Sequence, residues 1–323
     1  MKKRIAFLLA LACLLSLCAC HQEAVSSKDE YVTVYLPSEK IFDDGRTEIF
    51  TYDENGNLIE EVTYHNGVEG GRHTYTYDSN NHMLGEIFYN YGIEYRRDSY
   101  VYDENGNLTE YVCFLAATTN LEGCLAHGDT TDRDTYTYDE DGRLIEENHY
   151  SNGKEQSKYT YIYDSQTNRR YKYTYSKRDT GYEPNGIEVE IFDDQGRVIR
   201  SEYYHSDDKD RLDEAAPYTV CTYTYAGENL MEQISYREGK VDYYWTFDYN
   251  TQGDVIKRTY VHYNDRYGDS SSVQTYEYTY DTAGNITQYK QYTDGKHEKY
   301  ASYSCIYIAV KMTRQQAEEF GYI

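Results

Sequence analysis

A short motif, Tyr-Asp-x-x-Gly, recurs along this 323-residue chain from about residue 42 to residue 284. It is complete at Tyr52–Gly56, Tyr102–Gly106, Tyr138–Gly142 and Tyr280–Gly284. Looser copies begin at Tyr77, Tyr163, Phe192, Tyr225 and Tyr249. Self-similarity of this kind means that one supersecondary unit is stacked many times, so the motif predicts a repeat architecture.

Each copy of the motif predicts one β-hairpin. Before the turn the sequence alternates, as in Thr135-Tyr136-Thr137-Tyr138, and a period of two places the tyrosines on one face of a strand. In the turn, Asp can accept hydrogen bonds from backbone amides and Gly can adopt positive φ, which indicates a type I turn followed by a Gly bulge. The return strand then ends at a dipeptide such as Asn66-Gly67 or Asn152-Gly153, typical of two-residue hairpin loops.

Turns at both ends of every strand predict an all-β fold, an antiparallel meander of repeated β-hairpins. Nine units of two strands would span roughly 85 Å if they lay flat, so we expect a curled or superhelical sheet. The sheet should be one layer thick, with tyrosines such as Tyr75 and Tyr77 on its concave side and threonines such as Thr74 and Thr76 on the more solvated side.

The chain should end in a strand and one short helix. Thr313 and Gln316 form the pattern of a capping box, and a helix over residues 314–320 is expected to cover the edge of the last strand.

The first residues have the layout of an export signal. Lys2, Lys3 and Arg4 precede an apolar run that ends at Leu17. The sequence Leu17-Cys18-Ala19-Cys20 resembles the lipobox of bacterial lipoproteins, and the resemblance implies cleavage before Cys20 and a diacylglycerol on its thiol. The alternative is an ordinary secretory signal. We expect a lipoprotein signal peptide over residues 1–19, a tether over 20–30, the repeat domain over 31–300, and a C-terminal strand and helix cap over 301–323.

The repeats resemble the YD repeats of the rearrangement hotspot (RHS) group. Residues 134–146 match that pattern best, with Tyr138, Asp139, Gly142, Arg143 and Leu144 in place. The resemblance covers nearly all of residues 42–300 and implies a β-hairpin repeat fold in a cell-surface setting. Large members of that group coil their repeats into a β-shell around a toxin. This chain is expected to be too short for a closed shell, and nothing resembling a toxin follows residue 300.

Charge argues against nucleic acid as a partner. Without the three basic residues of the signal, 29 Lys and Arg face 56 Asp and Glu, so the formal charge is 29 minus 56, or −27. A body this acidic repels phosphate backbones. The 43 tyrosines, against 8 Phe and 1 Trp, must supply most of the packing surface.

Two groups of residues are candidate sites. Cys113 and Cys124 flank an insertion and predict a disulfide in an exported protein; a zinc site with His127 is the alternative, but it lacks a fourth ligand. Tyr243, Trp245 and Phe247 concentrate aromatic side chains around the single Trp. An exposed aromatic row can stack on sugar rings or on a protein partner, although cross-strand packing is the more common role.

Catalytic residues, metals and cofactors are not expected. Adjacent acids such as Glu60 and Glu61 point to opposite faces of a strand and cannot act on one substrate. The turn chemistry also accounts for Asp53–Asn57, which superficially resembles a calcium loop. The sequence thus favours a non-enzymatic binding module for a protein or glycan, lipid-anchored outside the cytoplasm on a bacterial cell membrane. The alternatives are a structural envelope component and, less favoured, a glycan-active enzyme.

Overall fold

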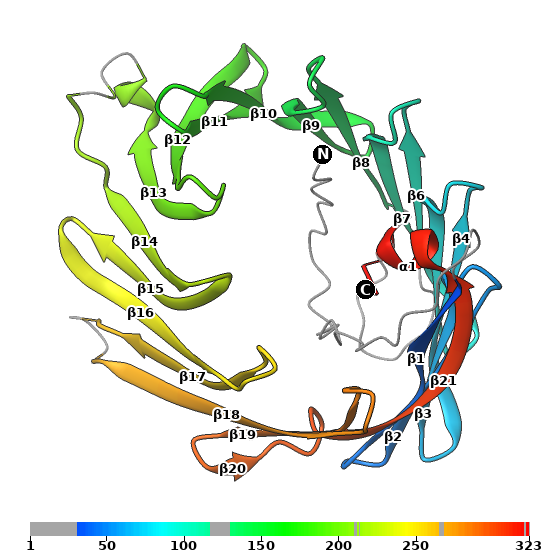
Figure 1. Cartoon of the computed structure of the whole chain (residues 1–323). Coiled ribbons are helices and arrows are strands. Elements are labelled where there is room, and N and C mark those ends of the chain that lie inside the picture. The colour runs from blue at the N-terminus through cyan, green and yellow to red at the C-terminus, as the bar shows by residue number, and fades with distance from the viewer. Residues whose placement is uncertain are drawn as a thin grey trace.

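A computed structural model describes residues 31–116, 130–209, 212, 214–264, 268–319 and 321–322 of the chain. Within these residues it contains a single sheet of 21 strands and one α-helix, and every strand pairing is antiparallel. The predicted all-β meander with a short C-terminal helix is confirmed, and Figure 1 shows the sheet curled around a central axis. None of the described helices is long and apolar enough to cross a membrane.

The strands follow one another around the sheet in chain order. The first ten are β1 (Tyr31–Phe42), β2 (Arg46–Tyr52), β3 (Leu58–His65), β4 (Val68–Tyr77), β5 (Met83–Asn90), β6 (Ile93–Tyr102), β7 (Leu108–Leu115), β8 (Thr130–Tyr138), β9 (Leu144–Ser151) and β10 (Lys154–Asp164). The next eleven are β11 (Arg169–Arg178), β12 (Gly181–Phe192), β13 (Val198–His205), β14 (Thr219–Ala226), β15 (Asn229–Arg237), β16 (Lys240–Tyr249), β17 (Val255–His262), β18 (Ser270–Tyr280), β19 (Ile286–Thr293), β20 (Lys296–His297) and β21 (Tyr303–Thr313). A 3-10 turn, η1 (Ser206–Asp208), follows β13, and α1 (Arg314–Glu319) follows β21.

The turns have the predicted geometry. In the first complete motif the amide of Gly56 donates to the carbonyl of Asp53 at 3.1 Å, and the amide of Asp53 donates to the carbonyl of Asn57 at 2.9 Å. Gly56, Gly106, Gly142 and Gly284 all have positive φ, between 76° and 91°. At the other end of the strands, Asn66-Gly67 and Asn152-Gly153 have positive φ at both residues, as a type I′ turn requires. All Asp-x-x-Gly turns therefore lie at one rim of the sheet and the two-residue turns at the opposite rim.

The sheet closes on itself. Strand β1 pairs with β2 on one side and, over a long ladder from Tyr31↔Thr313 to Phe42↔Tyr303, with β21 on the other. Strand β21 also meets β19, while β20 is attached only to β19, so twenty of the 21 strands complete a ring. The curled sheet that the sequence predicts is therefore a closed ring. Closure requires only that the first and last strands meet in register at a suitable tilt.

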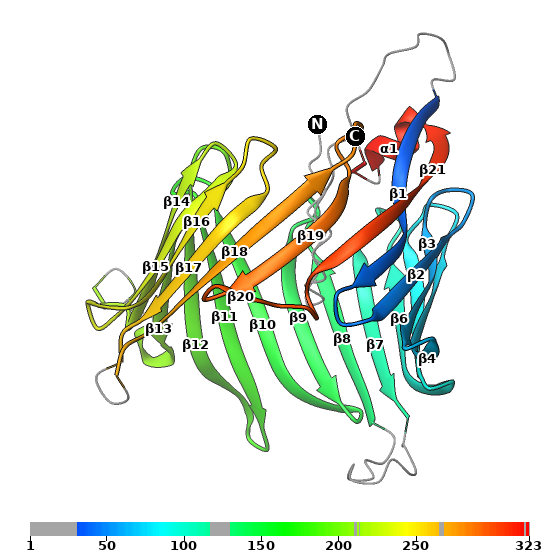
Figure 2. The ribbon, with the colours of Figure 1, turned by 90° about the horizontal axis from the view of Figure 1, so that it is seen from below.

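The helix lies inside this ring rather than over a strand edge. Thr313 and Gln316 form the predicted capping box: the Gln316 amide donates to Thr313 Oγ1 at 3.2 Å, and Gln316 Oε1 accepts from the Thr313 amide at 2.9 Å. Ala317 is fully buried in a cluster with Val34, Leu36 and Met312. Figures 1 and 2 show α1 within the ring beside β1 and β21. The prediction that it covers the edge of the last strand was wrong, because Ala317 packs on the inward-facing side chains of β1 and β21 instead.

The motif tyrosines line the concave face. Tyr52 packs against the cluster that holds Ala317, and antiparallel partners share a face of the sheet, so this face can be followed from strand to strand. We call this concave face, which carries Tyr52, Tyr77, Tyr102, Tyr138 and Tyr163, the inner wall.

The outer face is more solvated than the inner wall in strands such as β6, but not at every predicted threonine. Thr76, Thr137 and Thr279 are exposed, but Thr74 and Thr135 are half-buried, like the tyrosines beside them. At these positions, side chains of both neighbouring strands shield the threonine from solvent. Thr74, for example, lies between Glu60 and Ile87. The sheet is a single layer, as predicted, but the contrast between its two faces is weaker than the sequence suggests.

Candidate binding surface on the inner wall

The motif tyrosines join each repeat to the next through their hydroxyl groups. Tyr77 donates to the carbonyl of Leu58 at 2.9 Å, and Tyr102 donates to the carbonyl of Met83 at 3.0 Å. The accepting residue in each case begins the return strand of the preceding hairpin, at the point where a bulge interrupts the ladder. The same bond is made by Tyr138 to Leu108, Tyr163 to Leu144, Tyr225 to Val198 and Tyr249 to Leu230. Outside the motif position, Tyr278 makes it to Val255 and Tyr307 to Ile286, whereas the motif residue Tyr280 donates to the Asp254 carboxylate.

The third residue after the aliphatic start of each return strand also faces inward, and its chemistry changes around the ring. In β3, β5 and β9 this residue is Glu61, Glu86 and Glu147. Burial raises the pKa of both Glu61 and Glu147. In β13 and β15 the corresponding residues are Ser201 and Gln233, which carry no charge.

Basic groups accompany the carboxylates of the first part of the wall. His73 Nδ1 lies 2.6 Å from Glu86 Oε1, and His149 Nδ1 lies 2.7 Å from Asp134 Oδ1. Asp98, only 2% exposed, accepts from Arg96 Nη2 at 2.7 Å. Across the described parts of the chain, no three His, Cys, Asp or Glu side chains are grouped so as to hold a metal ion. These pairs satisfy one another and stabilise the wall.

Tyr243, Trp245 and Phe247, the aromatic residues singled out in the sequence, lie together on the inner wall in β16. Trp245 is 6.5 Å from Phe247, centroid to centroid, with the rings 18° from parallel. Tyr260 of β17 adds a fourth ring, 4.4 Å from Trp245 and 6.1 Å from Tyr243. All four rings are partly exposed. We call Tyr243, Trp245, Phe247 and Tyr260 the aromatic row.

Arg258 lies beside the aromatic row and is held in place by its own partners. Its guanidinium carbon is 5.0 Å from the Trp245 ring, and its Nε donates to Gln274 Oε1 at 3.0 Å. The same oxygen accepts from the Tyr276 hydroxyl at 2.9 Å. Sequence reasoning missed Tyr260 and Arg258, although they occupy the inward positions of the repeat that Glu147 and His149 occupy earlier in the chain.

A hollow of about 240 Å³ continues from the aromatic row toward β13. Tyr203, Cys221, Ser235 and Tyr243 contribute to its lining, and Ser235 is only 1% exposed. Asp242, at its margin, lies 3.1 Å from Arg237 Nη2 and 3.7 Å from His262 Nε2. The hollow therefore combines hydroxyl groups, aromatic rings and one compensated carboxylate.

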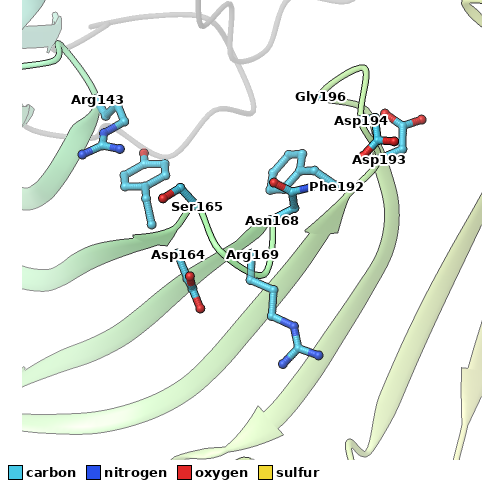
Figure 3. Close-up of a pocket in the computed structure, with 10 residues that line it drawn as sticks. Arg143, Asp164, Ser165, Asn168, Arg169, Phe192, Asp193, Asp194 and Gly196 are labelled. Atoms are coloured by element: carbon cyan, nitrogen blue, oxygen red, sulfur yellow. The ribbon is translucent and has the colours of Figure 1, made fainter.

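A larger hollow, of about 500 Å³, lies at the rim of the Asp-x-x-Gly turns. Figure 3 shows Arg143 on one side of it and Phe192 and Asp193 on the other. Its charges are used within the turns, because Arg143 Nε donates to Asp139 at 2.7 Å and Arg197 Nε donates to Asp193 at 2.8 Å. Hydrogen bonds from Arg143 lower the pKa of Asp139. The charged side chains around this hollow therefore stabilise the turns themselves.

The structure does not test the predicted lipidation site or the predicted disulfide. Cys20 lies outside the described residues, as do Cys124 and His127. Cys113 lies on the inner wall in β7, opposite Asp98 of β6. The disulfide between Cys113 and Cys124 therefore remains a prediction.

No protein-family model matches this chain, and no curated protein matches it. Among solved structures, that of TcdB2-TccC3 is similar at 12% identity and a TM-score of 0.34, over 85% of this chain and 16% of that one. A porin-like protein from Bacteroides uniformis matches at 13% identity and a TM-score of 0.29, over 87% of this chain and 96% of that one. A protein of unknown function from Bacteroides fragilis matches at 10% identity and a TM-score of 0.17, over 54% of this chain and 90% of that one. Likeness at this level carries no information about ligand or partner.

Proposed function

We propose that this chain is an exported, lipid-anchored and non-enzymatic binding module that holds a protein or glycan partner against its inner wall. The observation that carries the proposal is the aromatic row, four partly exposed rings in contact on a concave surface. Rings that only fill a core are normally covered, whereas partly exposed Trp and Tyr on a concave wall are typical of recognition surfaces.

The proposal also includes the lipid anchor at Cys20 and a relationship to the RHS/YD repeats. Leu17-Cys18-Ala19-Cys20 supports lipidation of Cys20, and the Tyr-Asp-x-x-Gly hairpins support kinship with the RHS/YD repeats. From Cys20 to the start of β1 at Tyr31 the chain can reach at most about 40 Å. Since β1 starts at the rim of the Asp-x-x-Gly turns, that rim would face the membrane.

Metabolic labelling with a fatty-acid analogue tests the anchor. The wild type and Cys18→Ser should be labelled, and Cys20→Ser should not. Equal labelling of all three proteins would contradict lipidation at Cys20.

Partner capture tests the binding role. Trp245→Ala should lose binding partners that the wild type retains, both in pull-down from envelope extracts and on a glycan array. Tyr244→Ala is the matched control, because Tyr244 is adjacent in sequence but faces outward, toward Tyr263. If both variants bind as the wild type does, the wall is not a recognition surface, and the structural envelope component becomes the better account.

A further inference from the structure

The last strand of the ring has one side that is only partly paired. On the side away from β1, the ladder between β21 and β19 holds two residue pairs and ends at Ser304. The Tyr307 hydroxyl still reaches the carbonyl of Ile286 at 2.9 Å, but β19 begins at that residue. From there β21 runs on beside β1 alone (Figure 2). No described strand pairs with residues 308–313 on this side, which we call the free edge.

Side-chain exposure shows the effect of the missing neighbour. Ile308 and Leu36 are direct partners in the ladder between β21 and β1, so they share a face of the sheet. Leu36 is 2% exposed, because it lies in the cluster with Ala317 against which Tyr52 of β2 also packs. Ile308 is 42% exposed, because it lies at the free edge, where no described strand adds such cover.

The free edge lacks the devices that usually protect an unpaired strand. Such strands are commonly interrupted by Pro, by a bulge or by several charged residues. Residues 306–313 of β21 contain no Pro, and Lys311 is their only charged residue. The register shift in this ladder lies instead on β1, next to Pro37. Over about 20 Å, the alternate residues of the free edge can therefore form about six backbone hydrogen bonds with another strand.

We propose that the free edge binds an extended segment of another exported protein as an added antiparallel strand. Backbone hydrogen bonds supply most of the affinity in this mode of recognition, and alternate side chains supply the specificity. The segment places apolar side chains beside Ile308 and Val310 and a carboxylate beside Lys311. This site goes beyond the proposed role of the inner wall and does not depend on the aromatic row.

A second copy of this chain is a poorer occupant. Two copies joined antiparallel along β21 are related by an axis at right angles to the strands, so their Asp-x-x-Gly rims point in opposite directions. Under the anchoring proposed above, two chains on one membrane cannot adopt this arrangement. Two bodies with a formal charge of −27 each also repel one another, whereas a short segment brings no such body.

A synthetic peptide, Tyr-Val-Glu-Val-Tyr-Leu with capped ends, serves as the probe. Its sequence is that of residues 31–36, which already pair antiparallel with the same six residues of β21 on the other side. Glu replaces Thr33, the direct partner of Lys311. Fluorescence polarisation of the labelled peptide, titrated with the purified full chain in detergent, should show saturable binding. The same peptide with Lys in place of Glu should bind roughly two- to fivefold more weakly.

Backbone methylation of the peptide tests strand pairing itself. Only alternate amides of an added strand face β21. N-methylation of the first, third and fifth residues, or of the second, fourth and sixth, should therefore weaken binding about tenfold or more, and the other set should have a much smaller effect.

Protein variants place the peptide at the free edge. Ile308→Lys should weaken binding at least fivefold, because it sets a charge among the apolar side chains of the edge. Ile162→Lys is the matched control, since Ile162 is 54% exposed on β10, a strand paired on both sides. Hydrogen exchange should slow at residues 308–313 while residues 31–36 keep their protection. Trp245→Ala should bind the peptide as the wild type does, which separates this site from the inner wall.

Several results would overturn the proposal. They are the absence of saturable binding, equal effects of the two methylated sets, and binding that Ile308→Lys leaves unchanged. Loss of protection in residues 31–36 would show that the peptide replaces β1 instead of adding a strand. Self-association of the full chain that Ile308→Lys abolishes would make a second copy the occupant and would overturn the proposed partner.

Discussion

Tyrosine is favoured over phenylalanine at the motif because its hydroxyl has a defined acceptor, although Phe192 occupies one copy. The bulge after each Asp-x-x-Gly turn interrupts the ladder, and the next repeat supplies the missing donor, as Tyr102 does for the carbonyl of Met83 at 3.0 Å. This bond accounts for Tyr at the motif positions, which hold only a small part of the 43 Tyr in the chain. The sequence showed which residues recur, but it gave no sign of the hydroxyl acceptor, which depends on the register between neighbouring hairpins.

Tyr102→Phe should lower the free energy of unfolding by about 0.5–1.5 kcal/mol, because it removes one hydrogen bond and leaves the ring in place. Urea denaturation followed by circular dichroism measures the change. Tyr300→Phe is the control, since Tyr300 is 59% exposed, and it should have almost no effect. Equal losses for the two variants would show that the hydroxyl bond to Met83 contributes nothing.

Alkaline pH should weaken the fold through the same tyrosines. Burial raises the pKa of Tyr77, Tyr138 and Tyr223 from the ordinary value of 10.0 to about 12. The unfolded chain therefore releases these protons first, so their contribution to stability is complete below pH 10 and is lost as the pH rises through 12. Urea midpoints at pH 8, 10 and 11, compared with the ultraviolet titration of phenolate, measure this loss. A midpoint that stays constant while phenolate forms would contradict it.

At the scale of the hairpin, local sequence was sufficient. Alternation placed the strands, and Asp, Gly and the Asn-Gly dipeptides placed the turns, because both depend on residues within one unit. The aromatic row, by contrast, could be predicted only in part from local sequence. Trp245 and its neighbours in β16 could be singled out, but Tyr260 and Arg258 reach them only through the register of β16 with β17.

Gly142→Ala should cost about 1–2 kcal/mol of stability, since Gly142 has a φ of 76°. A Cβ there would meet only Asn107 Oδ1 at 3.9 Å, so the expected loss comes from backbone strain alone. Gly186→Ala is the matched control: its Cβ would meet the Tyr204 carbonyl at an ordinary 3.6 Å and its φ is not positive. Denaturation midpoints compare the two variants. A loss at Gly186 as large as that at Gly142 would contradict the turn assignment.

At the scale of the molecule, closure was the feature that sequence reasoning did not find. No single residue specifies it, because it depends on the accumulated tilt of twenty strands and on the pairing of two segments that are far apart in the chain. The strand pattern of β1, with Val32, Val34 and Leu36 on one face, is visible in the sequence, but its partner β21 is not. The inner wall follows from this one pairing.

An engineered disulfide across the seam between β1 and β21 tests closure most directly. Thr33 and Lys311 are direct partners in that ladder, at a separation suited to a disulfide. In the double variant Thr33→Cys with Lys311→Cys, mild oxidation should join the two positions within one molecule. Mass spectrometry of the unreduced peptides would identify the bridge.

The hairpin pair Thr137→Cys with Glu146→Cys is the control, because β8 and β9 pair whether or not the ring closes. If the control oxidises while positions 33 and 311 stay reduced, or join only between molecules, the sheet is open and the inner wall does not exist as described.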